Sequence, residues 1–597
     1  MATTTATPDP TPPAPPAVSE RYRWTALSNT TLGVFMAALD ASIVLISLPA
    51  IFRGIHLDPL LPGNVSYLLW MIMGYLVVTA VLVVTFGRLG DIYGRVRMYN
   101  AGFAVFTVAS ILLSVTPFTG STGAMWLIGF RVVQGIGGAL LMANSTAIIT
   151  DAFPPDRRGS AMGINMIAGI AGSFIGLIAG GLLAAIDWRL VFWVNVPFGV
   201  FGTLWAYAKL RELGERRPAR IDWWGNLTFG LGLILVLIGI TYGIQPAGGH
   251  SMGWTSTKVL AELLTGVALL VVFVFVERRA TDPMFNLRLF RIRNFVMGNV
   301  ASLLASIGRG GLQFMLIIWL QGIWLPLHGY SFTSTPLWAG IYMLPLTCGF
   351  LVAGPAAGWL SDRLGPRPFA TGGMLLAALS FALLMLLPAN FSFGIFAVLL
   401  LMNGIGVGLF AAPNTTTIMN SAPPEQRGAA SGMRATFQNS GMVLSIGVFF
   451  SLMIVGLAAR LPATLGSGLR ANGVPAATAS KIAHLPPVGT LFAAFLGYNP
   501  IQKLLGPKLL SHLSPAQVQH LTGRSFFPHL ISDPFLHGLQ IAFTVSIVMC
   551  LVAAACSAMC RGRRDGEIEE PVGEFGAPLG EGDVGDEAPL TEEWVPA

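Results

Sequence analysis

Charged residues are scarce in this sequence. Asp, Glu, Lys and Arg together make up 11% of its 597 residues, whereas apolar residues make up 54%. A soluble domain carries roughly a quarter of charged residues, because its surface faces water. The shortage excludes an ordinary water-soluble protein and indicates a chain that lies largely within a membrane.

Cysteine is also rare, and its placement excludes further classes of protein. The four cysteines are Cys348, Cys550, Cys556 and Cys560. The first three lie in apolar runs and the fourth follows the last run, without the spacing of metal ligands. We expect no disulfide, no bound metal and no cofactor. A nucleotide-binding loop of the GxxxxGK[ST] type is absent as well, so ATP is not expected to drive the protein.

Long apolar runs, by contrast, are abundant. Stretches of about twenty residues, long enough to cross a bilayer as helices, recur between short polar loops. We count fourteen and predict an all-α polytopic membrane protein. The spans are predicted to start near Trp24, Val65, Tyr99, Ala124, Ser160, Leu190, Trp223, Thr257, Phe295, Thr335, Phe369, Ser392, Ala429 and Phe535.

Lysine and arginine are distributed unevenly among the loops. They gather in alternate short loops, and loops of this composition stay on the cytoplasmic side of a membrane. This bias predicts that both termini are cytoplasmic, which agrees with an even number of spans. The net charge of +7 then reflects topology and gives no reason to expect a nucleic-acid partner. The excess of arginine over lysine is typical of a GC-rich bacterial genome, so we expect a bacterial plasma membrane.

Three pairs of motifs indicate an internal repeat. GRLGDIYGRVR, from Gly87, returns as GWLSDRLGPRP, from Gly358, at an offset of 271. NSTAI, from Asn144, matches NTTTI, from Asn414, at an offset of 270. PPDRRGSAMG matches PPEQRGAASG at an offset of 269. Three collinear matches predict two related halves.

The repeat divides the chain into two halves of six spans with two further spans between them. The predicted parts are a disordered cytoplasmic tail at 1–23, an N-terminal six-helix bundle at 24–208, a linker with two extra transmembrane helices at 209–293, a C-terminal six-helix bundle at 294–560 and an acidic disordered cytoplasmic tail at 561–597. The second bundle would include an external loop at 460–534. Within that loop the apolar run at 488–498 is too short to span, and would lie on the membrane surface or fold as a hairpin.

The first repeated motif resembles the signature loop between the second and third spans of major facilitator superfamily transporters. Two six-span halves related by an axis along the membrane normal are also the architecture of that superfamily. The resemblance implies a major facilitator fold with a substrate site between the halves. The residues that carry the motif are Gly87, Gly90, Asp91, Gly94, Arg95 and Arg97 in the first copy, and Gly358, Asp362, Arg363, Gly365 and Arg367 in the second.

The same resemblance implies that the two loops form a cytoplasmic gate. Asp91 would dock at the start of the thirteenth span, at 428–430, and Asp362 would meet the fifth span near 159–161. Glycines let helices approach closely, and a carboxylate can meet a helix N-terminus or an arginine. These contacts would latch the cytoplasmic side shut. The alternative is that both segments are ordinary positive-inside loops with turn glycines.

Two further motifs resemble those of the fourteen-span drug:proton antiporters, the EmrB/QacA-like branch. They are LDASIVLISLPAI, which contains Asp40, and LIGFRVVQGIGGA, which contains Arg131 and Gln134. Asp40 lies about 24 Å from the cytoplasmic start of its span and Arg131 about 10 Å from the external start of its own, at 1.5 Å per residue.

Charges at matching depth in hydrocarbon must pair or face a cavity. We therefore expect Asp40 to exchange the coupling proton, with Arg131 setting its proton affinity and Gln134 beside them. The alternative is a permanent structural ion pair or a contact with backbone polar groups.

Arg309 is a buried charge in the ninth predicted span, and the offset of 269 makes it the equivalent of Asp40. It could bind an anionic or carbonyl-bearing substrate, neutralise Asp40 in one state, or have a structural partner elsewhere. Further polar candidates for the substrate cavity are Asn144, Gln313, Gln321, Asn403, Asn414 and Gln438.

The fifth predicted span carries a series of glycines that is similar to the antiporter signature of that helix. Glycines at these spacings allow tight helix packing whatever the direction of transport. Leu177 stands where the signature has proline, which leaves export and uptake both open. The glycines are Gly169, Gly172, Gly176, Gly180 and Gly181.

Together these features predict a proton-coupled secondary active transporter that exports lipophilic small molecules by alternating access. Its expected partners are that substrate, protons and membrane lipids, and it is expected to act as a monomer. One alternative is transport of a single, anionic metabolite with Arg309 as its anchor. From another class, the chain could be a membrane-embedded enzyme or sensor that works through the 460–534 loop, although the histidines there lack metal or triad spacing.

Overall fold

The structure is a computed structural model that describes residues 19–58, 63–213, 222–244, 252–280, 283, 285, 287–423, 426–484, 487–496 and 499–560. Helices are the only regular secondary structure in these segments, and fourteen are long and apolar enough to cross a membrane. The prediction of an all-α polytopic protein with fourteen spans is confirmed. Most of the predicted N-terminal tail and all of the acidic tail lie outside the described residues.

The N-terminal six-helix bundle begins earlier than the sequence predicted. Ser19 caps the first helix by accepting a hydrogen bond from the backbone N–H of Tyr22, so residues 20–23 are helical and not part of the tail. Gly94, with φ 109°, separates the second helix from the third, in a conformation that favours glycine. The helices are α1 (Glu20–Gly54), α2 (Asn64–Tyr93), α3 (Arg95–Ser114), α4 (Gly120–Ala152), α5 (Pro155–Ile186), and α6 (Leu190–Trp193) with α7 (Asn195–Lys209), which form the sixth span.

The C-terminal six-helix bundle has two interrupted spans. A π-helical turn breaks the ninth span, and a break at Met343 divides the tenth. The elements are η1 (Leu287–Arg291), α10 (Arg293–Trp319), η2 (Leu320–Trp324), α11 (Leu325–Leu327), α12 (Thr335–Tyr342), α13 (Leu344–Leu364), α14 (Pro366–Met385), α15 (Phe393–Ser421), α16 (Arg427–Ala471) and α21 (Phe526–Met559).

The two bundles repeat the same packing. In the first, α2 and α3 pack against α4, and α1 packs against α5. In the second, α13 and α14 pack against α15, and α10 packs against α16. The internal repeat of the sequence therefore corresponds to equivalent helices in equivalent places.

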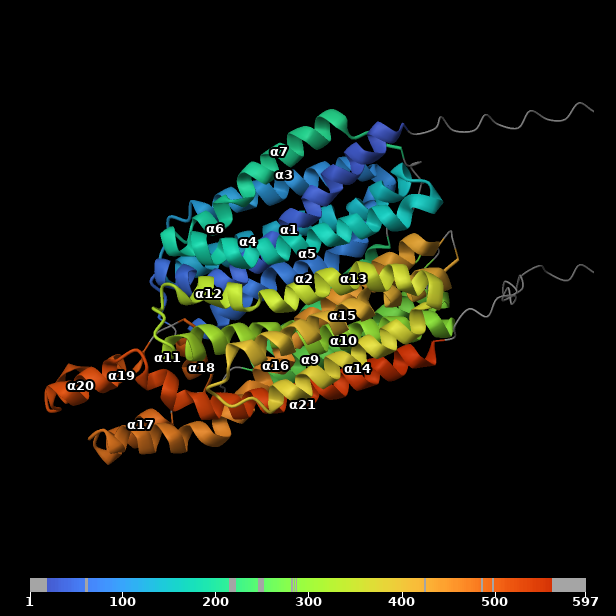
Figure 1. The fold of residues 1–597 in the computed structure, drawn as a ribbon. Helices are drawn as coiled ribbons and strands as arrows, with labels where there is room; N and C mark the ends of the chain where they lie inside the picture. The colour runs from blue at the N-terminus through green and yellow to red at the C-terminus, as the bar shows by residue number, and fades with distance from the viewer. Residues whose placement is uncertain are drawn as a thin grey trace, which may run out of the picture. The chain divides into compact units, whose positions relative to one another are not determined.

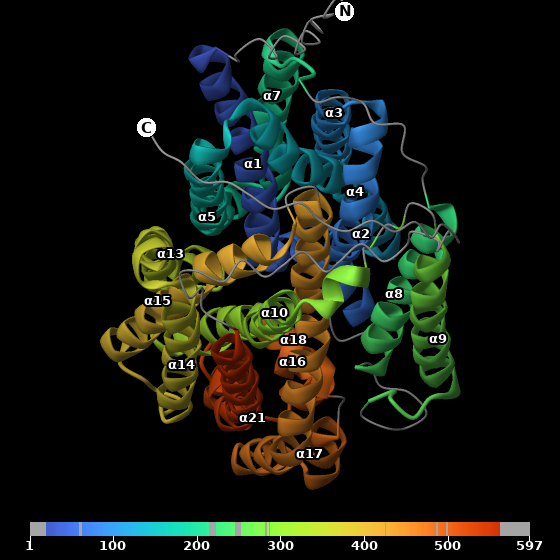
Figure 2. The same ribbon diagram turned by 90° about the vertical axis from the view of Figure 1, so that its right-hand side faces the viewer.

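The two extra spans, α8 (Trp223–Gly243) and α9 (Thr257–Arg279), lie beside each other at the edge of the helices (Figure 2). α8 packs against both α2 and α16, which also pack against each other. Thr241 donates a hydrogen bond to the sulfur of Met73 at 3.4 Å, and Ile240 lies against Gly447. The extra pair thus covers the seam where the two bundles meet. Much of α9 exposes apolar side chains, as a helix that faces lipid does.

Four short helices lie between α16 and α21, namely α17 (Ala476–Ala483), α18 (Pro487–Phe495), α19 (Ile501–Leu510) and α20 (Pro515–Thr522). Within the predicted 460–534 loop, residues 460–471 continue α16 and residues 526–534 begin α21. Figure 1 shows α17, α19 and α20 at one end of the bundles, opposite the end where α1 begins and α21 finishes. We name these the cap end and the terminal end.

The apolar run at 488–498 was predicted to lie on the membrane surface or to form a hairpin, and this is wrong. Its first part forms α18, which packs inside the protein against η2, α16 and α2. Phe492 stacks on Phe450 with ring centroids 5.3 Å apart, and the carbonyl of Ala494 lies against Gly322. The run is apolar because protein covers it on several sides.

Candidate functional site

Asp40 lies inside the N-terminal bundle with none of its surface exposed. Arg131 donates a hydrogen bond from Nη1 to Asp40 Oδ2 at 2.5 Å. Asn195 Nδ2 and Gln134 Nε2 both donate to Asp40 Oδ1, at 2.8 and 3.0 Å. The carboxylate of α1 therefore accepts three side-chain hydrogen bonds from α4 and α7.

Arg131 is equally enclosed, with 2% of its surface exposed. Its Nη1 also donates to Gln134 Oε1 at 2.5 Å, and its Nε donates to the carbonyl of Met71 at 3.3 Å. The ring of Tyr75 lies 4.6 Å from the guanidinium carbon. Loss of either partner of so buried a pair would leave a charge without compensation, which is more costly than keeping both.

The structure thus brings together Asp40, Arg131 and Gln134, as the sequence predicted. Sequence reasoning missed Asn195, and it missed Ser110, which accepts a hydrogen bond from Gln134 Nε2 at 2.9 Å. Asn195 could have been noticed as an amide in the middle of an apolar run. In the structure it lies at the break between α6 and α7.

The first motif loop is held by the N-terminal bundle and by the start of the linker that follows it. Asp91 Oδ1 accepts hydrogen bonds from Arg95 Nη2 and Nε at 2.7 and 2.9 Å, and Arg95 Nη1 donates to Asp151 of α4 at 2.5 Å. The backbone N–H of Arg97 donates to Glu212 beyond α7 at 2.8 Å. These bonds tie the α2–α3 loop to the ends of α4 and α7.

The predicted gate contacts involve residues that the structure does not describe fully. The side chain of Asp362 and the surroundings of residues 159 and 428 lie outside the described part, so the latch stays a prediction. In the second loop, Gly365 has φ 85° between α13 and α14, and Arg363 lies over the ring of Trp359 at 4.1 Å. Arg367 is exposed.

The predicted cavity residues Asn144 and Asn414 are equivalent in the repeat but bond to non-equivalent helices, because α10 corresponds to α1 and not to α2. Asn144 Nδ2 donates to the carbonyl of Phe86 on α2 at 3.4 Å, and Asn414 Nδ2 donates to that of Gly298 on α10 at 3.0 Å. Both amides therefore join neighbouring helices of one bundle. Gln438 Oε1 accepts a hydrogen bond from Arg434 Nη1 at 2.9 Å, and sequence reasoning overlooked this second arginine of the C-terminal spans.

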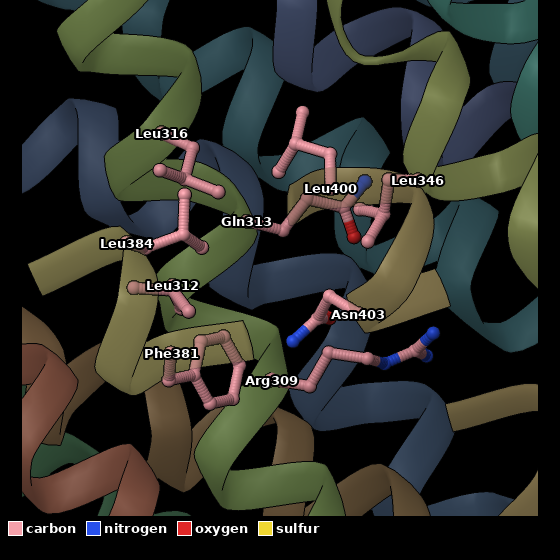
Figure 3. A pocket seen from close by; sticks show the side chains of 9 residues that line it. All are labelled: Arg309, Leu312, Gln313, Leu316, Leu346, Phe381, Leu384, Leu400 and Asn403. Carbon is pink, nitrogen blue, oxygen red and sulfur yellow. The ribbon is translucent and has the colours of Figure 1, made fainter. Parts of the chain in front are cut away.

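A small, partly open pocket lies within the C-terminal bundle (Figure 3). It brings together Arg309 and Gln313 of α10 with Asn403 of α15, whose Nδ2 donates to Ser380 Oγ at 2.7 Å. The rest of the lining is apolar and comes from α10, α13, α14 and α15, through Leu312, Leu316, Leu346, Phe381, Leu384 and Leu400.

The glycines of α5 serve two different neighbours. A β-carbon at Gly176 would lie 2.6 Å from the carbonyl of Leu39, and one at Gly180 would lie 2.8 Å from that of Ile43, so both glycines admit α1. A β-carbon at Gly181 would instead lie 2.6 Å from the backbone nitrogen of Leu337 on α12. This last glycine is a contact between the two halves.

Leu177, which replaces the proline of the antiporter signature, also lies at this contact. It is buried, and a β-carbon at Gly340 of α12 would lie 2.8 Å from its carbonyl. Nearby, Gln321 Nε2 donates to the carbonyl of Ile46 on α1 at 3.3 Å. Lys503 of α19 forms a salt bridge with Asp58, just beyond α1. The described state is therefore closed between the halves at the cap end.

The α1–α5 contact yields a prediction about stability. Replacement of Gly172 by Val should destabilise the protein by about 1–3 kcal/mol, the usual cost of overpacking. Its β-carbon would meet the carbonyl of Phe35 and lie 3.2 Å from the backbone nitrogen of Leu39. Gly163→Val is the matched control, because nothing lies within 4 Å of a β-carbon there. Thermal unfolding in detergent should show a lower midpoint for Gly172→Val alone, and equal midpoints would contradict the prediction.

Two related six-helix bundles, with a buried acid–arginine pair in one and a partly polar pocket in the other, define a secondary membrane transporter built from parallel repeats. Residues 30–446 match the family model of the Major Facilitator Superfamily, and the chain belongs to this family. The fold implied by the repeated motifs is confirmed.

Several curated relatives are similar to the chain over most of its length. It is 29% identical over 554 residues to the tetracenomycin C resistance and export protein of Streptomyces glaucescens, covering 92% of this chain and 93% of the relative. It is 30% identical over 467 residues to the uncharacterized transporter YebQ of Escherichia coli, covering 75% and 95%. It is 27% identical over 443 residues to the riboflavin transporter RibZ of Clostridioides difficile, covering 73% and 90%.

Solved structures support the same fold. A POT family transporter in complex with a thioalcohol-conjugated peptide matches with a TM-score of 0.53 at 17% identity, covering 82% of this chain and 96% of that one. A bacterial homologue of the human lysosomal transporter Spinster matches with a TM-score of 0.51 at 16% identity, covering 90% and 98%.

Proposed function

We propose that the protein is a proton-coupled antiporter that exports lipophilic small molecules, with its terminal end in the cytoplasm of a bacterial cell. The buried Asp40–Arg131 pair carries this proposal. A proton on Asp40 would cancel the charge that balances Arg131, and the low-dielectric interior makes an unbalanced arginine costly. Protonation would therefore force the network of α1, α4 and α7 to rearrange.

Such a rearrangement is what coupling requires, because a ligand shifts a conformational equilibrium only by its differential affinity for the two states. Asn195 and Gln134 connect the pair to α7 and α4, so a change at Asp40 reaches three helices at once. Export is supported by the relative named for tetracenomycin C resistance and export. The cytoplasmic placement of the terminal end rests on the arginine-rich loops there.

A second candidate function is transport of one specific metabolite, which the match to a riboflavin transporter favours. The two functions differ in the range of compounds that move and not in the fold. A panel of chemically unrelated compounds therefore separates them.

Proton movement in proteoliposomes tests the proposal. Purified protein is reconstituted with a pH-sensitive dye inside, a pH gradient is imposed, and ethidium, tetraphenylphosphonium or riboflavin is added. The two lipophilic cations should each dissipate the gradient faster than in protein-free liposomes. A response to riboflavin alone would favour the single-metabolite transporter, and compound movement without any proton movement would refute proton coupling.

A further inference from the structure

The pocket of Figure 3 is the C-terminal counterpart of the Asp40 network. The offset of 269 places Arg309 at the equivalent of Asp40, and Asn403 at the equivalent of Gln134. Asn403 bonds to Ser380 as Gln134 bonds to Ser110, at 2.7 and 2.9 Å, and these two serines are related by an offset of 270. One polar framework therefore occurs in both halves.

The two halves differ in the residues that fill this framework. With the offsets of 269 and 271, Leu400 stands where Arg131 stands, and Leu346 stands where Tyr75 stands. In the N-terminal half Arg131 and Tyr75 occupy the space beside Asp40. The shorter leucines fill less of the corresponding space beside Arg309, and both line the pocket. The pocket is thus explained by the replacement of the large side chains of Arg131 and Tyr75 by the smaller leucines at the equivalent positions of the second half.

The charge balance differs as well. Asp40 has its arginine, but among the described residues no carboxylate forms a salt bridge with Arg309. The contact that its guanidinium does make is with the ring of Phe350, at 5.8 Å. Arg309 is half-buried, and a guanidinium partly removed from water is stabilised when an anion or several acceptors approach it. The pocket therefore lacks the negative group that its counterpart contains.

The lining also has two chemically distinct sides. Figure 3 shows the side chain of Arg309 passing Asn403, with its guanidinium directed away from Phe381 and Leu312. The opposite side of the pocket is hydrocarbon. A compound that fills it needs an apolar body and an acidic group at one edge.

We propose that this pocket binds the acidic end of a transported compound, with Arg309 holding a carboxylate and the leucines and Phe381 enclosing an aromatic or alicyclic body. The planar guanidinium can bind a carboxylate through a bidentate pair of hydrogen bonds. Gln313 supplies a further amide donor. The apolar part of the lining supplies the contacts for the body of the compound. This inference rests on the proposed function and adds one substrate class, the apolar organic acids, to the lipophilic cations expected there.

Binding of an acid and its ester tests the proposal. The probes are 2-naphthoate and methyl 2-naphthoate, titrated into the full-length protein in lipid nanodiscs. Wild type should bind the acid more tightly than the ester. Arg309→Gln should weaken the binding of 2-naphthoate about 10- to 100-fold, as expected for loss of a hydrogen bond to a charged group. The same substitution should leave the affinity for the ester almost unchanged. Equal affinities of wild type for the two probes, or equal effects of the substitution on both, would overturn the proposal.

Two further variants separate binding from folding. Arg309→Lys keeps the positive charge but loses the planar guanidinium that bonds a carboxylate in a bidentate way. This variant should therefore retain part of the preference for the acid. Arg434→Gln removes a different arginine of the same half, outside the pocket lining, and should leave 2-naphthoate affinity unchanged. If Arg434→Gln weakens the acid as much as Arg309→Gln does, the assignment to this pocket is wrong.

The proteoliposome assay distinguishes failure of this inference from failure of the proposed function. If ethidium exchanges for protons while wild type does not prefer 2-naphthoate, the subsite is refuted and proton-coupled export stands. If 2-naphthoate binding depends on Arg309 while no compound moves protons, the coupling is refuted and the acid subsite stands.

Discussion

Replacement of Asp40 by Asn is expected to abolish transport driven by a pH gradient. Asparagine keeps the size of the side chain and one acceptor for Arg131, but it has no charge and exchanges no proton. In inverted membrane vesicles with an imposed pH gradient, ethidium accumulation should fall to the level of vesicles without the protein. Exchange of labelled for unlabelled compound at equal pH, which needs no proton turnover, should be retained better than accumulation.

Folding must be controlled in this experiment, because the substitution leaves Arg131 buried without its anion. Removing one partner of a buried pair destabilises a protein by about 3–5 kcal/mol. The double variant Asp40→Asn with Arg131→Gln removes both charges and should recover stability without recovering coupling. Thr30→Val is the matched control on the same helix, since Thr30 bonds only to carbonyls of α1 at 2.9 and 3.0 Å. A folded Asp40→Asn protein that still accumulates ethidium would refute the proton role.

The Asp40–Arg131 pair could be predicted because hydrocarbon leaves a charge few alternatives. Two opposite charges at matching depth had to face each other or a cavity, and they do face each other. Asn195 and Tyr75 could not be assigned in the same way. An amide or a phenol in an apolar run costs less to bury than a charge, so its presence does not dictate a partner, and the rotation of each helix decides where it points.

The repeat likewise predicted that Arg309 and Asp40 are equivalent, but not that a pocket opens beside Arg309. That outcome depends on Leu346 and Leu400 lying next to it, on two other helices. Their equivalence to Tyr75 and Arg131 carries meaning only once the N-terminal network shows which residues surround Asp40. Sequence reasoning found the charge, and the structure was needed to find the space.

The fold was easier to predict from the sequence than the arrangement of the candidate site. Apolar runs of spanning length gave fourteen helices and most of their starts within a few residues. The segment between α16 and α21 was misjudged because hydropathy measures burial of any kind. The apolar residues of α18 are buried by protein and not by lipid, and α16 remains helical well beyond its most apolar part.

The glycines of α5 show how the cap end closes, and they give the second large prediction. Gly181→Leu should abolish transport while leaving compound binding in place. Its side chain would meet the backbone of Leu337 on α12, which cannot move aside as a flexible side chain would. Overpacking of about 1–3 kcal/mol shifts the balance between the two states about 5- to 150-fold away from the described closure, and alternating access needs both states.

Accessibility of Gln321 measures this shift directly, because Gln321 is 1% exposed and bonded to α1 across the closed cap end. In a background without the native cysteines, Gln321→Cys should resist a membrane-impermeant maleimide, and addition of Gly181→Leu should make it react. Gly163→Leu on the same helix, where nothing lies within 4 Å, should change neither labelling nor transport. Transport by the Gly181→Leu variant at the wild-type rate, or continued protection of the cysteine from the maleimide, would mean that this contact does not close the path.

The position of the glycine on α5 matters, because Gly176 and Gly180 pack within one half. Only Gly181, next to Leu177 and Gly340, places the signature helix of the antiporters on the surface that must separate when the protein changes state.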